Sequence, residues 1–247
     1  MRMIIDVPRT IICVTCGVAA TIVAVAVILV IALFDDTSPV IDEIIRSWSR
    51  IWLFTSGTKL IVEGSANLDP QRSYVVVANH QSALDIMACL LAVPFPIRFL
   101  AKKELFRIPV LAQGMRAVGI VEVDREARGA IHARVNQQAK DLIAAGRSLI
   151  IYPEGTRPRD GVLRGFKKGA FTMAIAGQLP VLPLTIHGSF RAWPPGQPWL
   201  HGGTVTAVID KPIETEGLTH SDTGALRDEV FDQIAGRVAA LGGQVGV

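Results

Sequence analysis

The sequence predicts an α/β protein in which a mixed, largely parallel sheet is flanked by helices and preceded by a helical element at the N-terminus. The sheet is predicted because seven short β-type runs recur between residues 60 and 209, with helical patterns between several of them. The N-terminal element is predicted because residues 10–34 contain no charged side chain. Half of all residues are hydrophobic, enough for one well-packed domain with an appendage.

The β-type runs define the expected order of strands. Polar and charged blocks follow two of them directly, and active groups in α/β sheets lie at strand ends. The predicted strands are Leu60–Val62, Tyr74–Ala78, Ile97–Ala101, Ile120–Val123, Leu149–Tyr152, Val181–His187 and Thr204–Ile209.

Helical patterns lie between these strands and at the C-terminal end. Pro109 should break one of them, because a proline inside a helix removes a hydrogen bond and clashes with the preceding turn. Near the end of the chain, apolar residues repeat at helical spacing from Leu226 to Val238 and predict an amphipathic helix packed on the sheet. The other predicted helices are Ser82–Val93, Glu104–Ala117, Glu126–Ala145 and Lys168–Ala176.

Residues 10–34 predict a retained membrane helix. In helical form this run reaches about 37 Å, and a hydrocarbon core is about 30 Å thick. A secretory signal is the alternative, but the run exceeds the usual apolar length of about 7–15 residues. Residues 44–54 mix Trp, Phe and Ile with two arginines, which is typical of an interfacial helix. We therefore divide the chain into a membrane-associated element, residues 1–58, and a globular domain, residues 59–247.

The cysteines, the basic residues and the aromatic residues indicate which kinds of ligand the protein could bind. Cys13 and Cys16 lie in the apolar run, and no second pair of Cys or His residues completes a ligand cluster, so we expect no metal. The net charge is +3, with Lys and Arg concentrated around residues 102–107 and 157–168. These clusters favour an anionic ligand or anionic lipid headgroups. Stacking aromatic residues are too sparse for nucleic acid binding, and no nucleic acid partner is expected.

The block N-H-Q-S-A-L-D at residues 79–85 directly follows a predicted strand and places His80 and Asp85 five positions apart. In such an arrangement the imidazole accepts a proton and the carboxylate holds the ring in one tautomer. Taken alone, the pair more often marks a histidine at a helix N-terminus beside a surface aspartate. Ser82 suggests a Ser-His-Asp hydrolase, but the G-x-S-x-G turn is absent, so a helix-capping or structural hydroxyl is favoured.

Three further blocks follow in a fixed order. They read G-I-V-E-V-D-R at residues 119–125, Y-P-E-G-T-R at residues 152–157 and L-P-V-L-P-L at residues 179–184. Together with the first block they resemble the glycerolipid acyltransferase family, in particular the lysophosphatidic acid acyltransferases, whose blocks read NHxSxxD, D-R, FPEGTR and V-P. The resemblance covers about residues 60–210. Tyr152 stands where Phe is usual, and Pro158 stands where Ser is common.

The resemblance, together with the chemistry of the side chains, implies a role for each block. His80 is the expected general base, and Asp85 is expected to orient its ring and stabilise the imidazolium. Glu154 is expected to orient the loop or Arg157. Pro183 is expected to shape a wall of the acyl channel, with a strand-edge proline as the alternative. For Arg125, a candidate for phosphate binding, the alternative is an ion pair with Asp124 or Glu122. The candidates for binding the substrate phosphate are Arg157, Lys102, Arg125, Gly155 and Thr156.

The activity implied by the resemblance is acyl transfer from acyl-CoA or acyl carrier protein to the sn-2 hydroxyl of lysophosphatidic acid, which gives phosphatidic acid for phospholipid biosynthesis. No cofactor is expected beyond this thioester co-substrate. The expected location is the inner membrane, with the catalytic domain facing the cytoplasm. Another lysophospholipid, glycerol 3-phosphate or lyso-ornithine lipid is an alternative acceptor. A membrane thioesterase or lipid hydrolase that uses Ser82 is the alternative of another class.

Overall fold

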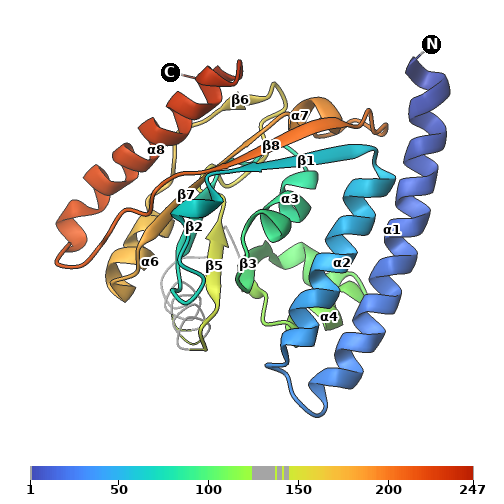
Figure 1. Cartoon of the computed structure of the whole chain (residues 1–247), viewed down its shortest axis with the longest axis horizontal. Helices are drawn as coiled ribbons and strands as arrows, with labels where there is room; N and C mark the ends of the chain where they lie inside the picture. Colours follow the sequence, from blue (N-terminus) through green and yellow to red (C-terminus); the bar gives the residue numbers. More distant parts are fainter. Residues whose placement is uncertain (1, 124–136, 138–140, 142–144, 247) are drawn as a thin grey trace.

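The computed structural model describes residues 2–123, 137, 141 and 145–246. Its centre is a seven-stranded sheet with the order β1-β8-β7-β2-β5-β3-β4 (Figure 1). Neighbouring strands are parallel except for β7 and β8, which are antiparallel, so the predicted mixed, largely parallel sheet is confirmed. The strands are β1 (Thr58–Glu63), β2 (Val75–Ala78), β3 (Ile97–Lys102), β4 (Val121–Val123), β5 (Ser148–Ile151), β7 (Val181–His187) and β8 (Gly203–Ile209).

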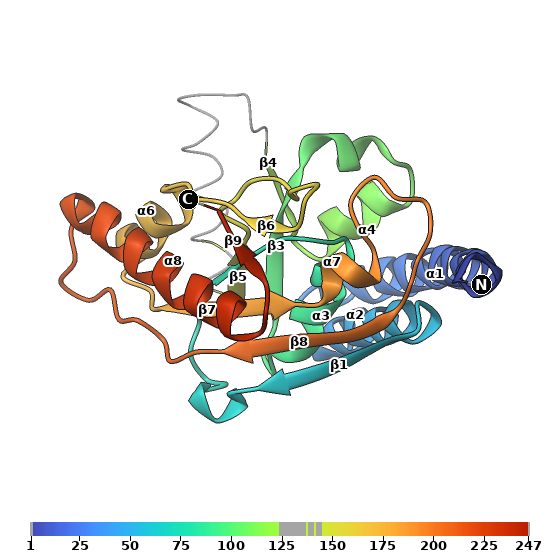
Figure 2. The same cartoon turned by 90° about the horizontal axis from the view of Figure 1, so that it is seen from above.

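Helices cover both faces of this sheet (Figures 1 and 2). The predicted break at Pro109 is confirmed, because a short 3₁₀ helix ends at Arg107 and α4 begins at Leu111. The predicted helix Glu126–Ala145 lies outside the described residues, apart from Gln137, Asp141 and Ala145. The α-helices are α1 (Arg2–Ala32), α2 (Pro39–Thr55), α3 (Leu84–Ala92), α4 (Leu111–Ala117), α6 (Gly169–Gly177), α7 (Ser189–Ala192) and α8 (Thr223–Ala240). The 3₁₀ helices are η1 (Ser65–Asn67), η2 (Lys103–Arg107) and η3 (His220–Asp222), and β6 (Val162–Leu163) pairs with β9 (Gln244–Val245).

Alternation along β2 separates two apolar cores. Val75 and Val77 belong to a cluster with α6 and α8, whereas Val76 and Ala78 belong to a cluster with α3 on the opposite face. Successive side chains of a strand point to opposite faces, so a strand buried on both faces reads as a continuous apolar run. The amphipathic helix predicted near the C-terminus is confirmed as α8, whose apolar residues from Leu226 to Val238 are buried against the sheet.

Helix α1 is, by length and composition, apolar enough over Met3–Ala32 to cross a membrane. It nevertheless contacts the rest of the protein near both ends. Near its start, Asp6 Oδ2 lies 2.7 Å from His201 Nδ1, and Thr10 Oγ1 accepts a hydrogen bond from the backbone of Leu200. Towards its other end, Val25 packs against Gly114 of α4 so closely that a Cβ on this glycine would lie 2.4 Å from it.

Two arginines hold α2 in place. Arg46 of α2 donates to the carbonyls of Leu90 and Val93 at 2.9 and 2.7 Å, at the C-terminal end of α3, where a helix carries partial negative charge. The buried Arg98 of β3 pairs with Asp42 of α2 at 2.6 Å and donates to the carbonyl of Val118. Arg46 therefore docks α2 on the globular part, a function that the interfacial pattern of residues 44–54 did not predict.

The order of the strands gathers three segments at one edge of the sheet. Strand β2 lies between β7 and β5, and β5 pairs with β3, all in parallel. In register, Val77 lies opposite Ile151 of β5 and Pro183 of β7. The residues that follow β2, β5 and β3 therefore emerge side by side, and the first two of these segments are the polar blocks at residues 79–85 and 152–157.

Candidate active site

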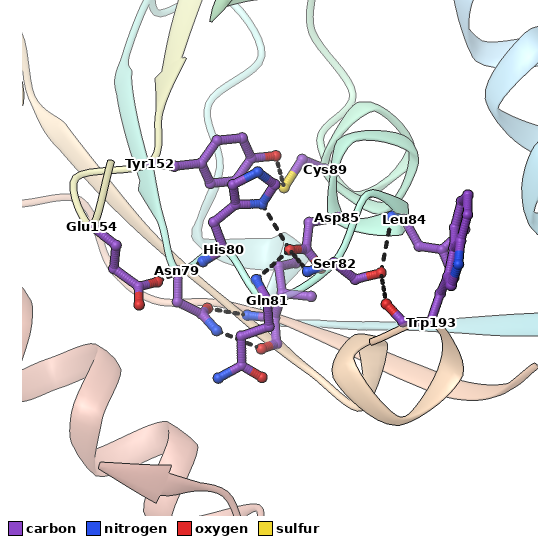
Figure 3. Close-up of polar contacts among 11 residues, drawn as sticks. Asn79, His80, Gln81, Ser82, Leu84, Asp85, Cys89, Tyr152, Glu154 and Trp193 are labelled. Atoms are coloured by element: carbon purple, nitrogen blue, oxygen red, sulfur yellow. Dashed lines mark hydrogen bonds and ion pairs between the residues drawn. The ribbon is translucent and has the colours of Figure 1, made fainter. Parts of the chain in front are cut away.

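At the end of β2, the partly buried His80 pairs with the buried Asp85 (Figure 3). His80 Nδ1 lies 2.9 Å from Asp85 Oδ2, and the same oxygen accepts the backbone N–H groups of Gln81 at 2.6 Å and Ser82 at 2.8 Å. Asp85 is completely buried in the first turn of α3. Because an ionised carboxylate only accepts hydrogen bonds, Nδ1 carries the proton of the neutral ring. Nε2 is then the nitrogen that can accept a proton.

Asn79 joins the start of this turn to the neighbouring strand. Its side chain donates to the carbonyl of Ile186 at 2.8 Å and accepts the N–H of Ile186 at 2.7 Å. Gln81 donates to the carbonyl of Gly161 at 3.0 Å. Neither residue had a predicted role, although polar side chains directly after a buried strand were a signal. Both fix the backbone on either side of His80.

The hydroxyl of Ser82 binds residues other than His80. Its hydroxyl donates to the carbonyl of Trp193 at 2.9 Å and accepts the N–H of Leu84 at 3.3 Å (Figure 3). A hydroxyl has one hydrogen to donate, and here it is directed to Trp193. Among the described residues no hydrogen bond joins Ser82 to His80, and the geometry therefore supports the structural interpretation of Ser82 over a nucleophile.

Glu154 connects the loop after β5 to the loop after β2. One carboxylate oxygen accepts the backbone N–H of His80 at 2.7 Å, and the other accepts that of Arg164 at 3.1 Å. The side chain is 5% exposed, and this burial raises the pKa of Glu154 to about 7 although the two N–H donors oppose the shift. Within the described residues it forms no bond with Arg157. Its contacts support a role in orienting the loop through His80 and Arg164.

The loop after Glu154 turns at Gly155, which has a φ of +75°. The positive φ favours glycine here, and a Cβ at this position would lie 2.7 Å from Lys167 Nζ, the movable end of a long side chain. Thr156 and Arg157 are exposed, and Arg157 makes no hydrogen bond or ion pair with the described residues. Lys167, which the sequence analysis placed only in a basic cluster, brings a second cation beside this turn.

The other predicted residues differ in how the structure places them. Lys102 ends β3 at the same edge of the sheet and lies 3.4 Å from Glu104. Arg125 lies outside the described residues. Pro183 is buried in β7, between β2 and β8, so the alternative of a strand-edge proline is wrong. Among the residues that the structure describes, no group of three His, Cys, Asp or Glu side chains could hold a metal ion.

Tyr152 and Cys89 lie near His80, and neither had a predicted role. The rings of Tyr152 and His80 stack with centroids 4.0 Å apart, and the Tyr152 hydroxyl lies 3.5 Å from Cys89 Sγ. The signal was present in the sequence: tyrosine replaces the usual phenylalanine, and Cys89 lies four positions after Asp85 in a predicted helix.

Glu154 should make the stability of the protein depend on pH. The pKa of Glu154 is about 7 in the folded protein, against an ordinary value of 4.5. Its contribution to the free energy of unfolding is therefore complete below about pH 4.5 and is lost as the pH rises through 7. Glu154→Gln removes this titration. We expect the unfolding free energy of the wild type, minus that of the variant, to fall between pH 4.5 and 7.5 by at most about 3 kcal/mol. Denaturant titrations across this range measure it, and a constant or rising difference would contradict the assignment.

Comparisons with known proteins agree with the geometry. A family model described as Acyltransferase matches residues 59–187. A chloroplastic 1-acyl-sn-glycerol-3-phosphate acyltransferase of Arabidopsis thaliana is 34% identical over 81% of this chain and 57% of its own length. The human 1-acyl-sn-glycerol-3-phosphate acyltransferase alpha is 30% identical over 70% of this chain and 62% of its own. The matches thus span about three fifths of these two relatives.

A solved structure resembles the whole chain. The crystal structure of the 1-acyl-sn-glycerophosphate acyltransferase PlsC from Thermotoga maritima superposes with a TM-score of 0.84 at 27% identity, and the match covers 98% of both chains. The likeness therefore includes the N-terminal helices as well as the sheet. Since the family model also matches more than half of the sequence, the protein belongs to the acyltransferase family.

Proposed function

We propose that the protein transfers a fatty acyl chain from a thioester to the sn-2 hydroxyl of 1-acylglycerol 3-phosphate and so makes phosphatidic acid. The observation that carries the proposal is the His80–Asp85 pair, whose 2.9 Å contact leaves His80 Nε2 as the proton acceptor at the end of a strand. The names of the relatives in Arabidopsis thaliana, Homo sapiens and Thermotoga maritima support the choice of this acceptor.

In the proposed reaction His80 is the general base. Nε2 takes the proton of the acceptor hydroxyl while the oxygen attacks the thioester carbonyl, and Asp85 stabilises the imidazolium that forms. Collapse of the tetrahedral intermediate breaks the C–S bond, and the imidazolium returns the proton to the leaving thiolate. The new ester bond forms directly on the acceptor, so no acyl-enzyme and no cofactor is required.

The phosphate of the acceptor is proposed to bind beside the loop after β5. Arg157 is exposed there, and a guanidinium binds a phosphate through two parallel N–H donors. Lys167, which follows β6, reaches the turn at Gly155 from the next segment, and Lys102 ends the neighbouring strand β3. These cations favour an anionic acceptor over a neutral one. Acyl-CoA and acyl carrier protein present the same thioester, and both are candidate donors.

We propose that α1 and α2 anchor the protein in the cytoplasmic leaflet of the inner membrane. Large apolar side chains such as Phe34, in the turn after α1, and Phe54 of α2 are 88% and 85% exposed, which suits contact with acyl chains. Because α1 contacts the domain near both of its ends, we place it along the domain within one leaflet.

The proposed topology is tested with a C-terminal tag on the full chain in cells. External protease should leave the tag intact until the membrane is permeabilised, and the protein should sediment with the membrane. Cleavage of the tag in intact cells would place the domain outside and contradict the proposal.

The proposed reaction is tested with purified protein, radiolabelled palmitoyl-CoA and lysophosphatidic acid. Parallel reactions use palmitoyl carrier protein as donor and lysophosphatidylcholine, glycerol 3-phosphate, lyso-ornithine lipid or no acceptor. We expect phosphatidic acid as the product and a loss of about 10²–10⁴-fold in His80→Ala, the usual contribution of a general base. Ser82→Ala should keep most of the activity.

Three outcomes would contradict parts of this assignment. A loss below about tenfold in His80→Ala would remove His80 from the mechanism, since it lies far below the range for a general base. Release of fatty acid without acceptor, abolished by Ser82→Ala, would indicate a hydrolase. Transfer only to another acceptor would keep the mechanism and replace the substrate.

Arg157→Ala should raise KM for lysophosphatidic acid by about 10- to 100-fold, because a charge-assisted hydrogen bond contributes about 1.5–3 kcal/mol. Arg159→Ala is the matched control, since Arg159 is exposed on the same loop two positions away. Steady-state kinetics at varied acceptor concentration give the KM of each variant, and we expect it to rise in Arg157→Ala but not in Arg159→Ala. Equal KM values in both variants would show that the cluster attracts the acceptor only through its overall charge.

A further inference from the structure

We propose that Tyr152 and Cys89 are positioning residues for His80: the tyrosine ring fixes the plane of the imidazole, and the cysteine satisfies the tyrosine hydroxyl, which would otherwise pull the ring out of the stack to find a partner. The inference rests on the proposed role of His80 in acyl transfer. The stacking of Tyr152 adds a second constraint on the His80 ring, independent of the Asp85 hydrogen bond. The sequence blocks did not predict this packing.

The two aromatic rings lie almost parallel. Their centroids are 4.0 Å apart and their planes differ by 15°, which is close stacking (Figure 3). Behind Tyr152 lies Phe99, with its centroid 6.3 Å away and its plane tilted by 17°. Phe99 is 8% exposed and belongs to the apolar cluster around α3, so the tyrosine is supported from the core.

The hydroxyl of Tyr152 is held at the far end of the ring. It donates to Cys89 Sγ over 3.5 Å, and Cys89 is completely buried in α3. Burial raises the pKa of both the Tyr152 hydroxyl and the Cys89 thiol, so both remain protonated and uncharged. The contact is therefore a neutral hydrogen bond within the core, and this cysteine is not a nucleophile.

One helix face provides both constraints. Asp85 and Cys89 are four positions apart in α3, and residues at this spacing lie on the same side of a helix. Asp85 binds His80 Nδ1 within the ring plane, whereas Cys89 acts through Tyr152 against the face of the ring. A single hydrogen bond at Nδ1 still tolerates a limited tilt of the imidazole about the Cβ–Cγ bond, and the stack limits this tilt.

The stack also suits the charge that His80 acquires during the reaction. When the imidazole accepts a proton it becomes a cation, and the face of a tyrosine ring attracts a cation at this distance. The carboxyl groups nearest the ring are Asp85, which binds Nδ1, and Glu154, which binds the backbone N–H. Tyr152 thus supports the ring in its neutral and its protonated state, and its loss should affect turnover more than acceptor binding.

The first test removes the ring and compares the two tyrosines of the chain. Tyr74 is the matched control, because it is 1% exposed, stacks on Phe95 at 5.2 Å and lies in the same apolar cluster. We expect Tyr152→Leu to lower kcat for palmitoyl transfer by about 10- to 100-fold, the cost of a misplaced catalytic group, with KM within about threefold of wild type. Tyr152→Phe keeps the stack and should retain kcat within about threefold. Tyr74→Leu should change stability but not kcat per folded enzyme.

The second test does not depend on a large cavity. Cys89→Ala leaves the buried Tyr152 hydroxyl without its acceptor and should lower kcat, whereas Cys89→Ala combined with Tyr152→Phe removes the unmatched hydroxyl and should restore it. A restored kcat supports the proposal even where Tyr152→Leu fails to fold. Equal kcat in wild type, Cys89→Ala and the double variant, or equal losses in Tyr152→Leu and Tyr74→Leu, would overturn it. Inactive wild type, or an active His80→Ala, would instead overturn the proposed function.

Discussion

One carboxylate oxygen organises the site. Asp85 Oδ2 accepts three N–H groups, from the ring of His80 and from the backbones of Gln81 and Ser82. The carboxylate is completely buried, and it lies in the first turn of α3, where the partial positive charge of a helix N-terminus favours an anion. The turn that closes around this oxygen sets where His80 stands, and every other contact of the ring depends on that position.

The parallel pairing of β2 and β5 brings a second carboxyl group, that of Glu154, to His80, where it binds the main chain. Because β2 and β5 are adjacent and parallel, Glu154 at the end of β5 reaches the backbone N–H of His80 at the end of β2. Asp85 thus holds the side chain of His80 while Glu154 holds its main chain. Burial raises the pKa of Glu154 against the opposing effect of its two N–H donors. The bridge from His80 to Arg164 keeps the cationic loop next to the histidine.

The N-terminal helices and the site share α3. Arg46 of α2 binds the carbonyls at the C-terminal end of α3, and Asp85 lies at the N-terminal end of the same helix. Helix α1 packs outside α2 and returns to the domain through Asp6 and His201 (Figure 1). The apolar helices are therefore built onto the layer that carries the His80–Asp85 pair, so their exposed apolar surface and the strand-end site belong to one packed unit.

The sequence by itself determined the seven strands of the central sheet and the order of the polar blocks, but not the small pair β6 and β9. It also determined the pairing of His80 with Asp85, because residues so close in the chain meet through local turn geometry. It also identified an apolar N-terminal helix from its length and lack of charge. Only the tertiary structure decided what joins these parts: Glu154 on the backbone of His80, Arg46 on α3 and Tyr152 between His80 and Cys89. Each of these contacts links residues from different elements, and no periodicity or spacing encodes which strands become neighbours.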